Sequence, residues 1–340
     1  MDSLSQLALG AAVGVAVMGR RTAVWKAALW GGVCGTLPDL DAFIDQGDAV
    51  RNMVLHRAES HALFWQTLAA PVIAAGIAAL HGGRALFPRW ALAVWLVLVT
   101  HALLDAMTVY GTQLALPFSD HPYGVGSIFI IDPLYTLPLL VGVVAAMCWR
   151  ANDRALRWNR TGLVLSSVYL AWGVVAQWHV TGIARTALAA QGIVAQQLLV
   201  VPAPFNSVLW RVVATTGDSY HEGFRSLLDR GAGMHFDRFD RGAGLYTPLA
   251  AHEPVARVAA FSGGLYAMAE DQGRVRISDL RMGQQPHYSF AFVVAQRAAD
   301  GVTLQPLSAP VAVGSRPPDI GATLRWIGRR ALGEPLPPPR

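Results

Sequence analysis

Two ionisable side chains stand four residues apart inside a long apolar stretch of the sequence. His101 and Asp105 lie in the segment 90–110, and a spacing of i, i+4 places an imidazole and a carboxylate on the same face of a helix. Ionisable side chains within a membrane-spanning helix are costly and usually mark a functional position. The pair therefore predicts metal binding or catalysis, and the alternative is a buried His–Asp hydrogen bond that only joins helices.

A second set of polar residues leads directly into the apolar segment 62–81. It contains His56, Glu59 and His61. Imidazole is the commonest metal ligand, and two imidazoles together with carboxylates suit zinc or another divalent ion. Glu59 is a candidate base that could take a proton from water. It is equally a carboxylate of a first helical turn, where the helix dipole favours negative charge.

Two carboxylates follow Pro38 at the end of the apolar segment 23–37. Asp39 and Asp41 are two residues apart, and alternating carboxylates in a loop are typical of cation ligation through oxygen. Alone the pattern is weak, because acidic loops are common. It gains weight because the histidines above should reach the same level of the membrane. Asp41 is the second candidate, beside Glu59, for the group that accepts a proton.

The elements that must position these residues are apolar. Of the 340 residues, 53% are hydrophobic and 14% are charged, against about 25% charged in ordinary soluble domains. Small residues four apart, Gly10/Gly14 and Gly31/Gly35, allow helix backbones to approach closely. Four of the six apolar segments approach the ~20 residues that a spanning helix requires. The six segments are 6–19, 23–37, 62–81, 90–110, 127–149 and 161–181. We expect an α-helical integral membrane bundle of about four to six membrane helices over residues 1–181.

The charges of this half are sorted by position. Nine of its 11 basic residues fall in the connections 20–26, 82–89 and 150–160, and nine of its 10 acidic residues map to the opposite ends of the segments. The positive-inside rule makes the basic connections cytoplasmic. The acidic, histidine-bearing end then faces the periplasm.

The second half has a different composition. Residues 182–315 are rich in Gly, Pro and Arg, and runs such as 197–201 and 288–294 resemble strands. We expect a smaller soluble, β-rich, extracytoplasmic domain there, followed by a loose Pro/Arg-rich tail over 316–340. No basic run with interleaved aromatic residues suggests nucleic acid. The sequence also lacks HExxH, GxSxG and Walker A motifs, which argues against zincins, serine hydrolases and ATP-driven pumps.

Several of these stretches together resemble the YdjM-like family of bacterial inner-membrane proteins. The resemblance is carried by 1–14, 35–41, 56–61, 101–105, 110–113, 117–119, 130–135, 204–206, 220–223 and 278–283. The family is generally described as membrane-bound, metal-dependent hydrolases. The chain departs from the family pattern at Ala58 and Ala62, where Gly and Ser are usual.

The resemblance implies a set of metal ligands with two further residues close to it. The implied ligands are Asp39, His61, His101 and Asp105, and His56, itself a candidate ligand, and Asp41 lie beside them.

Residues and resemblance together favour one functional hypothesis. We expect a multi-pass protein of the bacterial inner membrane that hydrolyses an ester or phosphodiester with a divalent ion, zinc being favoured. The expected partners are the lipid bilayer and a phosphodiester or lipid-linked substrate, without nucleic acid. The alternatives are a transporter of metal ions or small solutes and a non-catalytic membrane scaffold.

Overall fold

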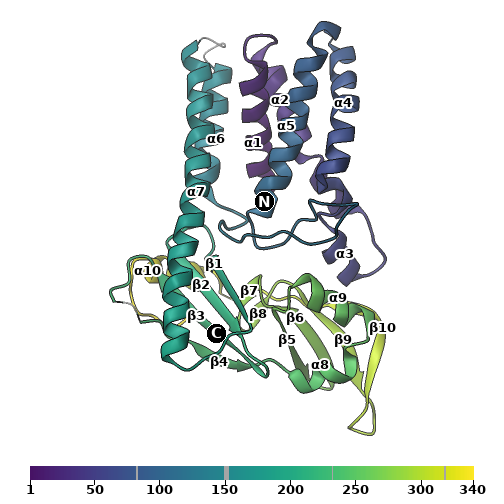
Figure 1. Cartoon of the computed structure of the whole chain (residues 1–340), viewed down its shortest axis with the longest axis vertical. Helices are drawn as coiled ribbons and strands as arrows, with labels where there is room; N and C mark the ends of the chain where they lie inside the picture. The colour runs from purple at the N-terminus through teal and green to yellow at the C-terminus, as the bar shows by residue number, and fades with distance from the viewer. Residues whose placement is uncertain (82, 149–152, 232, 318) are drawn as a thin grey trace. The chain divides into compact units, whose positions relative to one another are not determined.

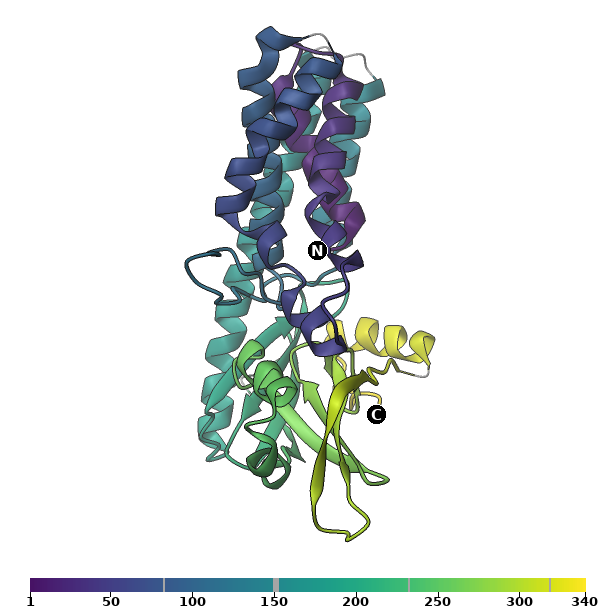
Figure 2. The same cartoon turned by 90° about the vertical axis from the view of Figure 1, so that its right-hand side faces the viewer.

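Residues 1–81, 83–148, 153–231, 233–317 and 319–340 are described by a computed structural model (Figures 1 and 2). Contacts divide the chain into two compact units. The helical unit comprises Met1–Phe43, His56–Val174 and Pro204–Asn206. The β-sheet unit comprises Ile44–Leu55, Val175–Ala203 and Ser207–Arg340.

The helical unit is a bundle of long apolar helices (Figure 1). Its elements are α1 (Ser3–Met18), α2 (Val24–Thr36), η1 (Pro38–Phe43), η2 (Glu59–His61), α4 (Leu63–Leu80), η3 (Arg84–Leu86), α5 (Phe87–Ala106), α6 (Pro133–Cys148) and the first part of α7 (Asp153–Ala190). These positions agree with the six apolar segments predicted from the sequence. Residues 82 and 150–152 of the predicted basic connections lie outside the described residues.

Within the described residues, three helices are long and apolar enough to cross a membrane. They are Leu63–Leu80, Arg84–Ala106 and Asp153–Ala190, and Ser3–Met18 and Pro133–Cys148 are shorter apolar helices. Many of their large apolar side chains point outward, among them Val72 and Leu80. A helix that is apolar on every face belongs in a protein core or in a membrane. The prediction of a helical first half is confirmed, and the described part of it contains helices of membrane-spanning length. The total of four to six spans stays a prediction.

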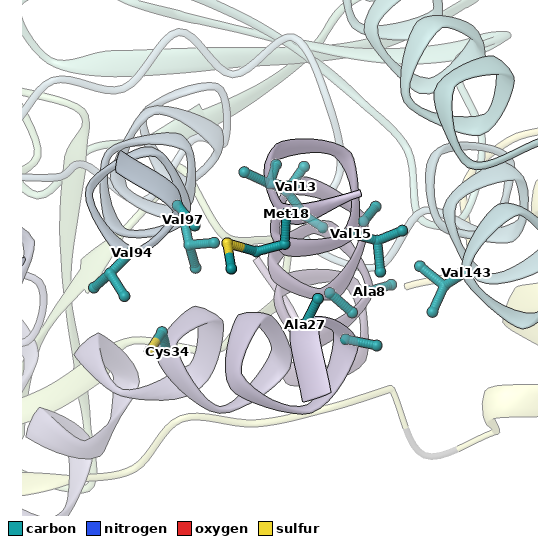
Figure 3. Close-up of a cluster of buried hydrophobic side chains, with 14 of the residues drawn as sticks. Ala8, Val13, Val15, Met18, Ala27, Cys34, Val94, Val97 and Val143 are labelled. Atoms are coloured by element: carbon teal, nitrogen blue, oxygen red, sulfur yellow. The ribbon is translucent and has the colours of Figure 1, made fainter. Parts of the chain in front are cut away.

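The predicted glycine contacts between the first two helices are present. A Cβ atom on Gly10 would lie 2.2 Å from the carbonyl oxygen of Gly31, and one on Gly31 would lie 2.2 Å from the carbonyl oxygen of Gly10. Only glycine permits this approach of α1 and α2. Around it, small and β-branched side chains such as Ala27, Val15 and Val97 fill the core (Figure 3).

The polar residues gather at one end of the bundle. Because the helices alternate in direction, α1 begins, α2 ends, α4 begins and α5 ends at this end (Figure 1). The two short 3-10 helices η1 and η2 and the segment 107–132 lie there as well (Figures 1 and 2). The fold thus brings four helix ends, from distant parts of the sequence, to one place.

The β-sheet unit contains two four-stranded antiparallel sheets, ordered β1-β2-β3-β4 and β10-β9-β6-β5, and a short β7-β8 pair. Its strands are β1 (Gln197–Pro202), β2 (Leu209–Thr215), β3 (Ser219–Ser226), β4 (Asp237–Asp240), β5 (Tyr266–Asp271), β6 (Arg274–Asp279), β7 (Gly283–Gln284), β8 (His287–Tyr288), β9 (Ala291–Arg297) and β10 (Leu304–Ala312). The predicted β-rich second half is confirmed.

Helices accompany these sheets, one of them in the segment expected to be a loose tail. They are α3 (Ala49–Leu55), α8 (Ala243–Leu249), α9 (Glu253–Phe261) and α10 (Ile320–Ala331). The helix α10 begins with a side-chain cap from Asp319 and buries Trp326 and Ile327 in a cluster with Leu209. This amphipathic pattern, rather than the surrounding prolines, decides the structure of the segment.

Candidate metal centre

Four residues from three elements converge at the polar end of the helical bundle. Asp39 lies in η1, His61 ends η2, and His101 and Asp105 occupy the last turns of α5. One ligand atom from each lies within 4.8 Å of the other three. The two histidines and Asp105 are buried, whereas 19% of the Asp39 side chain is exposed.

The separations between these atoms are short and similar. His61 Nε2 lies 3.0 Å from His101 Nε2 and 3.1 Å from Asp105 Oδ2. Asp39 Oδ1 lies 3.5 Å from His61 Nε2 and 3.6 Å from His101 Nε2. Ligands at about 2.0–2.1 Å from a tetrahedral zinc ion are separated by about 3.3 Å. The geometry therefore fits one metal ion between the four groups.

The second ring nitrogen of each histidine determines which nitrogen faces the cluster. His101 Nδ1 is 2.7 Å from the carbonyl oxygen of Gly35, which can only accept a hydrogen bond. His61 Nδ1 donates to Ser60 Oγ at 2.8 Å, since that hydroxyl donates in turn to Asp41 Oδ2 at 2.6 Å. Both Nδ1 atoms therefore carry a proton, so in the neutral rings the Nε2 atoms, which face each other, are the ones free to bind a cation. A cation between them resolves this arrangement, and such outer hydrogen bonds are typical of metal-binding histidines.

Asp105 presents one carboxylate oxygen to the cluster. Its Oδ1 accepts a hydrogen bond from Gln6 Nε2 at 3.0 Å and contacts the amino group of Met1. Its Oδ2 faces the two imidazoles and lies 3.3 Å from Arg57 Nε. The carboxylate is thus oriented for a single bond to a metal ion through Oδ2.

Asp41 and His56 form an outer layer behind His61. Asp41 Oδ1 lies 2.7 Å from His56 Nδ1, and Asp41 Oδ2 accepts hydrogen bonds from Ser60 Oγ and from the backbone nitrogen of Arg57. The structure places His56, which the sequence suggested as a ligand, outside the group of four. It places Asp41, a candidate base, where its oxygens hold His61 and its neighbours in position.

Hydrogen bonds decide the direction of the pKa shifts of Asp41 and His61. Burial by itself raises the pKa of Asp41, but hydrogen bonds from His56, His61 and Ser60 outweigh it and hold that pKa well below its usual range. Burial lowers the pKa of His61, whereas its hydrogen bonds to Asp105, Asp39 and Asp41 outweigh burial and raise the pKa to about 9. The carboxylates therefore stabilise positive charge at His61, which is either a second proton on the ring or a metal cation in its place.

Arg57 is a candidate functional residue that the sequence pattern of histidines and carboxylates did not predict. Its side chain is buried, and its guanidinium lies 4.9 Å from the centre of the Tyr110 ring. Its Nη1 donates to Thr108 Oγ1 at 3.2 Å. The backbone of Arg57 has a φ of 65°, a left-handed conformation that is uncommon for a side-chain-bearing residue and recurs at functional sites.

Glu59 lies apart from this network. It is exposed at the first residue of η2 and does not belong to the group of four. Gln6, by contrast, belongs to the network, although the sequence pattern did not predict it as a site residue. Its one signal was a polar side chain inside the first apolar segment.

A family model described as "YdjM inner membrane protein" matches residues 1–180 of the chain. The match contains all four residues of the metal cluster and both outer residues. The further stretches of resemblance at 204–206, 220–223 and 278–283 lie beyond it. Searches of curated proteins and of solved structures found no match. Because the model covers more than half of the chain, this protein belongs to the YdjM inner membrane protein family.

Proposed function

We propose that this protein is a membrane-bound, metal-dependent hydrolase that cleaves a phosphodiester at the membrane–water interface. The observation that carries the proposal is the pair of imidazole Nε2 atoms 3.0 Å apart, with carboxylate oxygens of Asp39 and Asp105 beside them. Two imidazoles with carboxylates suit zinc. When bound, a divalent ion supplies Lewis acidity, which polarises the scissile group and makes water a stronger nucleophile at neutral pH.

The exposure of the four groups differs in a way that suits catalysis. Structural zinc sites are closed, whereas catalytic sites keep one position for water or substrate. His61, His101 and Asp105 are buried and account for three positions, while Asp39 lies on the accessible side. We assign Asp39 to the face where substrate and water approach, where its carboxylate can accept a proton. Asp41 orients His61 from behind.

The charge of Arg57 favours a phosphodiester over a neutral ester. The guanidinium is buried beside Asp105, and arginine is well suited to binding phosphate because of its fixed charge and planar donors. A developing negative charge on a phosphoryl group is stabilised strongly by a positive group in a site of low dielectric constant. Arg57 would hold and orient an anionic substrate next to the cluster.

The depth and orientation of the site belong to the same proposal. His61 lies two residues before α4, and Asp105 lies one residue before the end of α5. Both helices are candidate membrane spans, so the cluster would lie at headgroup level. The basic connections occur at the other end of the bundle, and the positive-inside rule then places the site and the β-sheet unit in the periplasm.

The experiment compares metal content and hydrolysis in one preparation. Purified protein in detergent is expected to carry about one divalent ion per chain by elemental mass spectrometry and to hydrolyse bis(p-nitrophenyl) phosphate. His101→Ala combined with Asp105→Ala should lose both properties, because two of the three buried ligands are removed. The matched control is His179→Ala, which removes an exposed imidazole in α7.

Two results would reject the proposal. Unchanged metal content in the double variant would place the metal elsewhere. Stoichiometric metal without hydrolysis of soluble or vesicle-embedded phosphodiesters would reject the enzyme and favour a transport or structural role for the same ligands.

A further inference from the structure

We propose that η1 is a membrane-inserted lip through which a phospholipid reaches the metal centre directly from the bilayer. The η1 lip consists of residues Pro38–Phe43. The substrate class, a lipid with a phosphodiester headgroup linkage, rests on the proposed function. The insertion of the lip does not.

The helix type gives the η1 lip an apolar outer face. A 3-10 helix has three residues per turn, so the side chains of residues i and i+3 lie directly above one another. Leu40 and Phe43 have this spacing, and they are 54% and 85% exposed. Pro38 and Asp41 share another face, where Pro38 is buried and Asp41 bonds to the groups behind His61. One short helix thus combines an inward face, which carries Asp41, with an outward apolar face.

The metal cluster fixes the level of the η1 lip relative to the membrane helices. Asp39 belongs to the lip, and its Oδ1 lies within 3.6 Å of both imidazole Nε2 atoms. His61 lies two residues before α4, and His101 lies in the last turns of α5. The lip is therefore held at the ends of two candidate spans, where the bilayer meets water. At that boundary an exposed apolar face lies in lipid rather than in water.

Aromatic residues occur at the same end of α4. The rings of Phe64 and Trp65, in the first turn of α4, are 4.9 Å apart, and Phe118 lies 5.6 Å from Phe64. Phe118 is 79% exposed. Aromatic side chains are enriched where helices cross the membrane–water interface. This group independently places the interface at the level of η2, which holds His61.

The accessible side of the cluster is the side of the η1 lip. Asp39 is the most exposed of the four residues of the cluster, and it precedes Leu40 in the η1 lip. A molecule that reaches the cluster on this side passes the η1 lip, next to the outer face formed by Leu40 and Phe43. A lipid can do so while its acyl chains stay in the bilayer and its phosphodiester faces Arg57 and the ligands.

Insertion is tested by spin labelling of the full chain. In a Cys34→Ala, Cys148→Ala background, a nitroxide is attached at Phe43→Cys, or at Leu40→Cys as the second position. The protein is reconstituted into vesicles of phosphatidylethanolamine and phosphatidylglycerol. The matched control is Val302→Cys, a 77% exposed apolar residue in the turn between β9 and β10.

The ratio of nitroxide collisions with oxygen to collisions with a water-soluble nickel chelate reports the surroundings. We expect this ratio to be several-fold higher at residues 40 and 43 than at residue 302, because oxygen concentrates in lipid. A water-like ratio at 40 and 43 would overturn the proposal. Shielding from both reagents would also overturn it, since protein rather than lipid would then cover the lip.

Substrate delivery is tested separately with Leu40→Ser combined with Phe43→Ser. The readout is the rate on phosphatidylglycerol vesicles divided by the rate on bis(p-nitrophenyl) phosphate. We expect this ratio to fall about tenfold relative to the unsubstituted protein. An equal loss on both substrates would mean damage to the metal centre and would overturn delivery through the lip. If the unsubstituted protein hydrolyses neither, the proposed function fails, while the nitroxide result still decides insertion.

Discussion

Both units bury charged side chains. In the β-sheet unit these side chains form a closed network, in which the charged groups are paired with one another. Arg211 donates from Nε to Glu222 Oε1 at 2.8 Å and from Nη1 to the carbonyl oxygen of Leu280 at 2.8 Å. The other oxygen of Glu222 accepts from Arg340 Nη1 at 2.6 Å. Each charge meets an opposite charge or a polar partner, so the network needs nothing further. Such a network is structural.

The cluster in the helical unit remains open by comparison. Two imidazole lone pairs face each other, and the carboxylates of Asp39 and Asp105 point to the same spot. Arg57 offsets one negative charge. The amino group of Met1 contacts Asp105 as well, so the acceptors left over are the Asp39 carboxylate and the imidazole nitrogens, and these call for a cation. A binding site therefore differs from a structural network in the acceptor atoms that lack a partner. The number of buried charges does not distinguish the two.

The closed network can be broken by removing its central carboxylate. Glu222→Ala leaves the buried guanidinium of Arg211 without its counter-charge. Removing one partner of a buried pair costs about 3–5 kcal/mol. We expect a large loss of thermal stability of the β-sheet unit, with unchanged metal content. Glu270→Ala is the control, because the Glu270–Arg297 pair is more exposed and should matter much less. Loss of metal in Glu222→Ala would contradict the separation of the two networks.

The two buried arginines should differ in what they bind. The guanidinium of Arg211 is bonded to groups of the β-sheet unit, whereas that of Arg57 is proposed to hold a phosphate. We expect Arg57→Gln to weaken the binding of inorganic phosphate to the metal-loaded protein by about 10- to 100-fold, the range for a hydrogen bond to a charged group. Calorimetry measures it, and Arg238→Gln, at a 65% exposed side chain, is the control. Unaltered phosphate binding with retained metal would leave Arg57 a structural role only.

The outer hydrogen bonds of the open cluster provide a finer test. Ser60→Ala removes the acceptor that holds His61 Nδ1–H. Loss of such an outer partner typically weakens metal binding by about 10- to 100-fold. Competition with a fluorescent zinc chelator measures the affinity, and Ser119→Ala, at an exposed serine, is the control. Equal affinity in both variants would show that His61 is oriented without Ser60.

The most indirect effect on the cluster is expected from the packing that supports it. Gly31→Ala places a methyl group 2.2 Å from the carbonyl oxygen of Gly10, and overpacking of this kind costs about 1–3 kcal/mol. Thermal unfolding in detergent should detect it. Gly76→Ala, where a Cβ meets no atom within 4 Å, should leave stability equal or slightly higher because alanine is the better helix former. Similar effects of both substitutions would contradict the close α1–α2 contact.

Local patterns in the sequence determined the helices and part of the site. The apolar segments predict the ends of each long helix to within six residues, except that α7 extends further than the segment 161–181 at both ends. The i, i+4 spacing of His101 and Asp105 places both on one helix face. The small residues Gly10 and Gly31 predict where two helices touch. The amphipathic helix α10 was missed because the prolines and arginines around it hid its short apolar face.

Only the tertiary structure decided how the polar residues divide their roles. The distance from Asp41 to His61, the contact of Arg57 with Asp105 and the Gly35 carbonyl that orients His101 all join residues far apart in the sequence. These contacts depend on how far each helix is shifted along its axis and rotated about it when the helices pack. The same residue types are compatible with many such arrangements. The sequence therefore determined which chemical groups are available, whereas packing decided which of their atoms face one another.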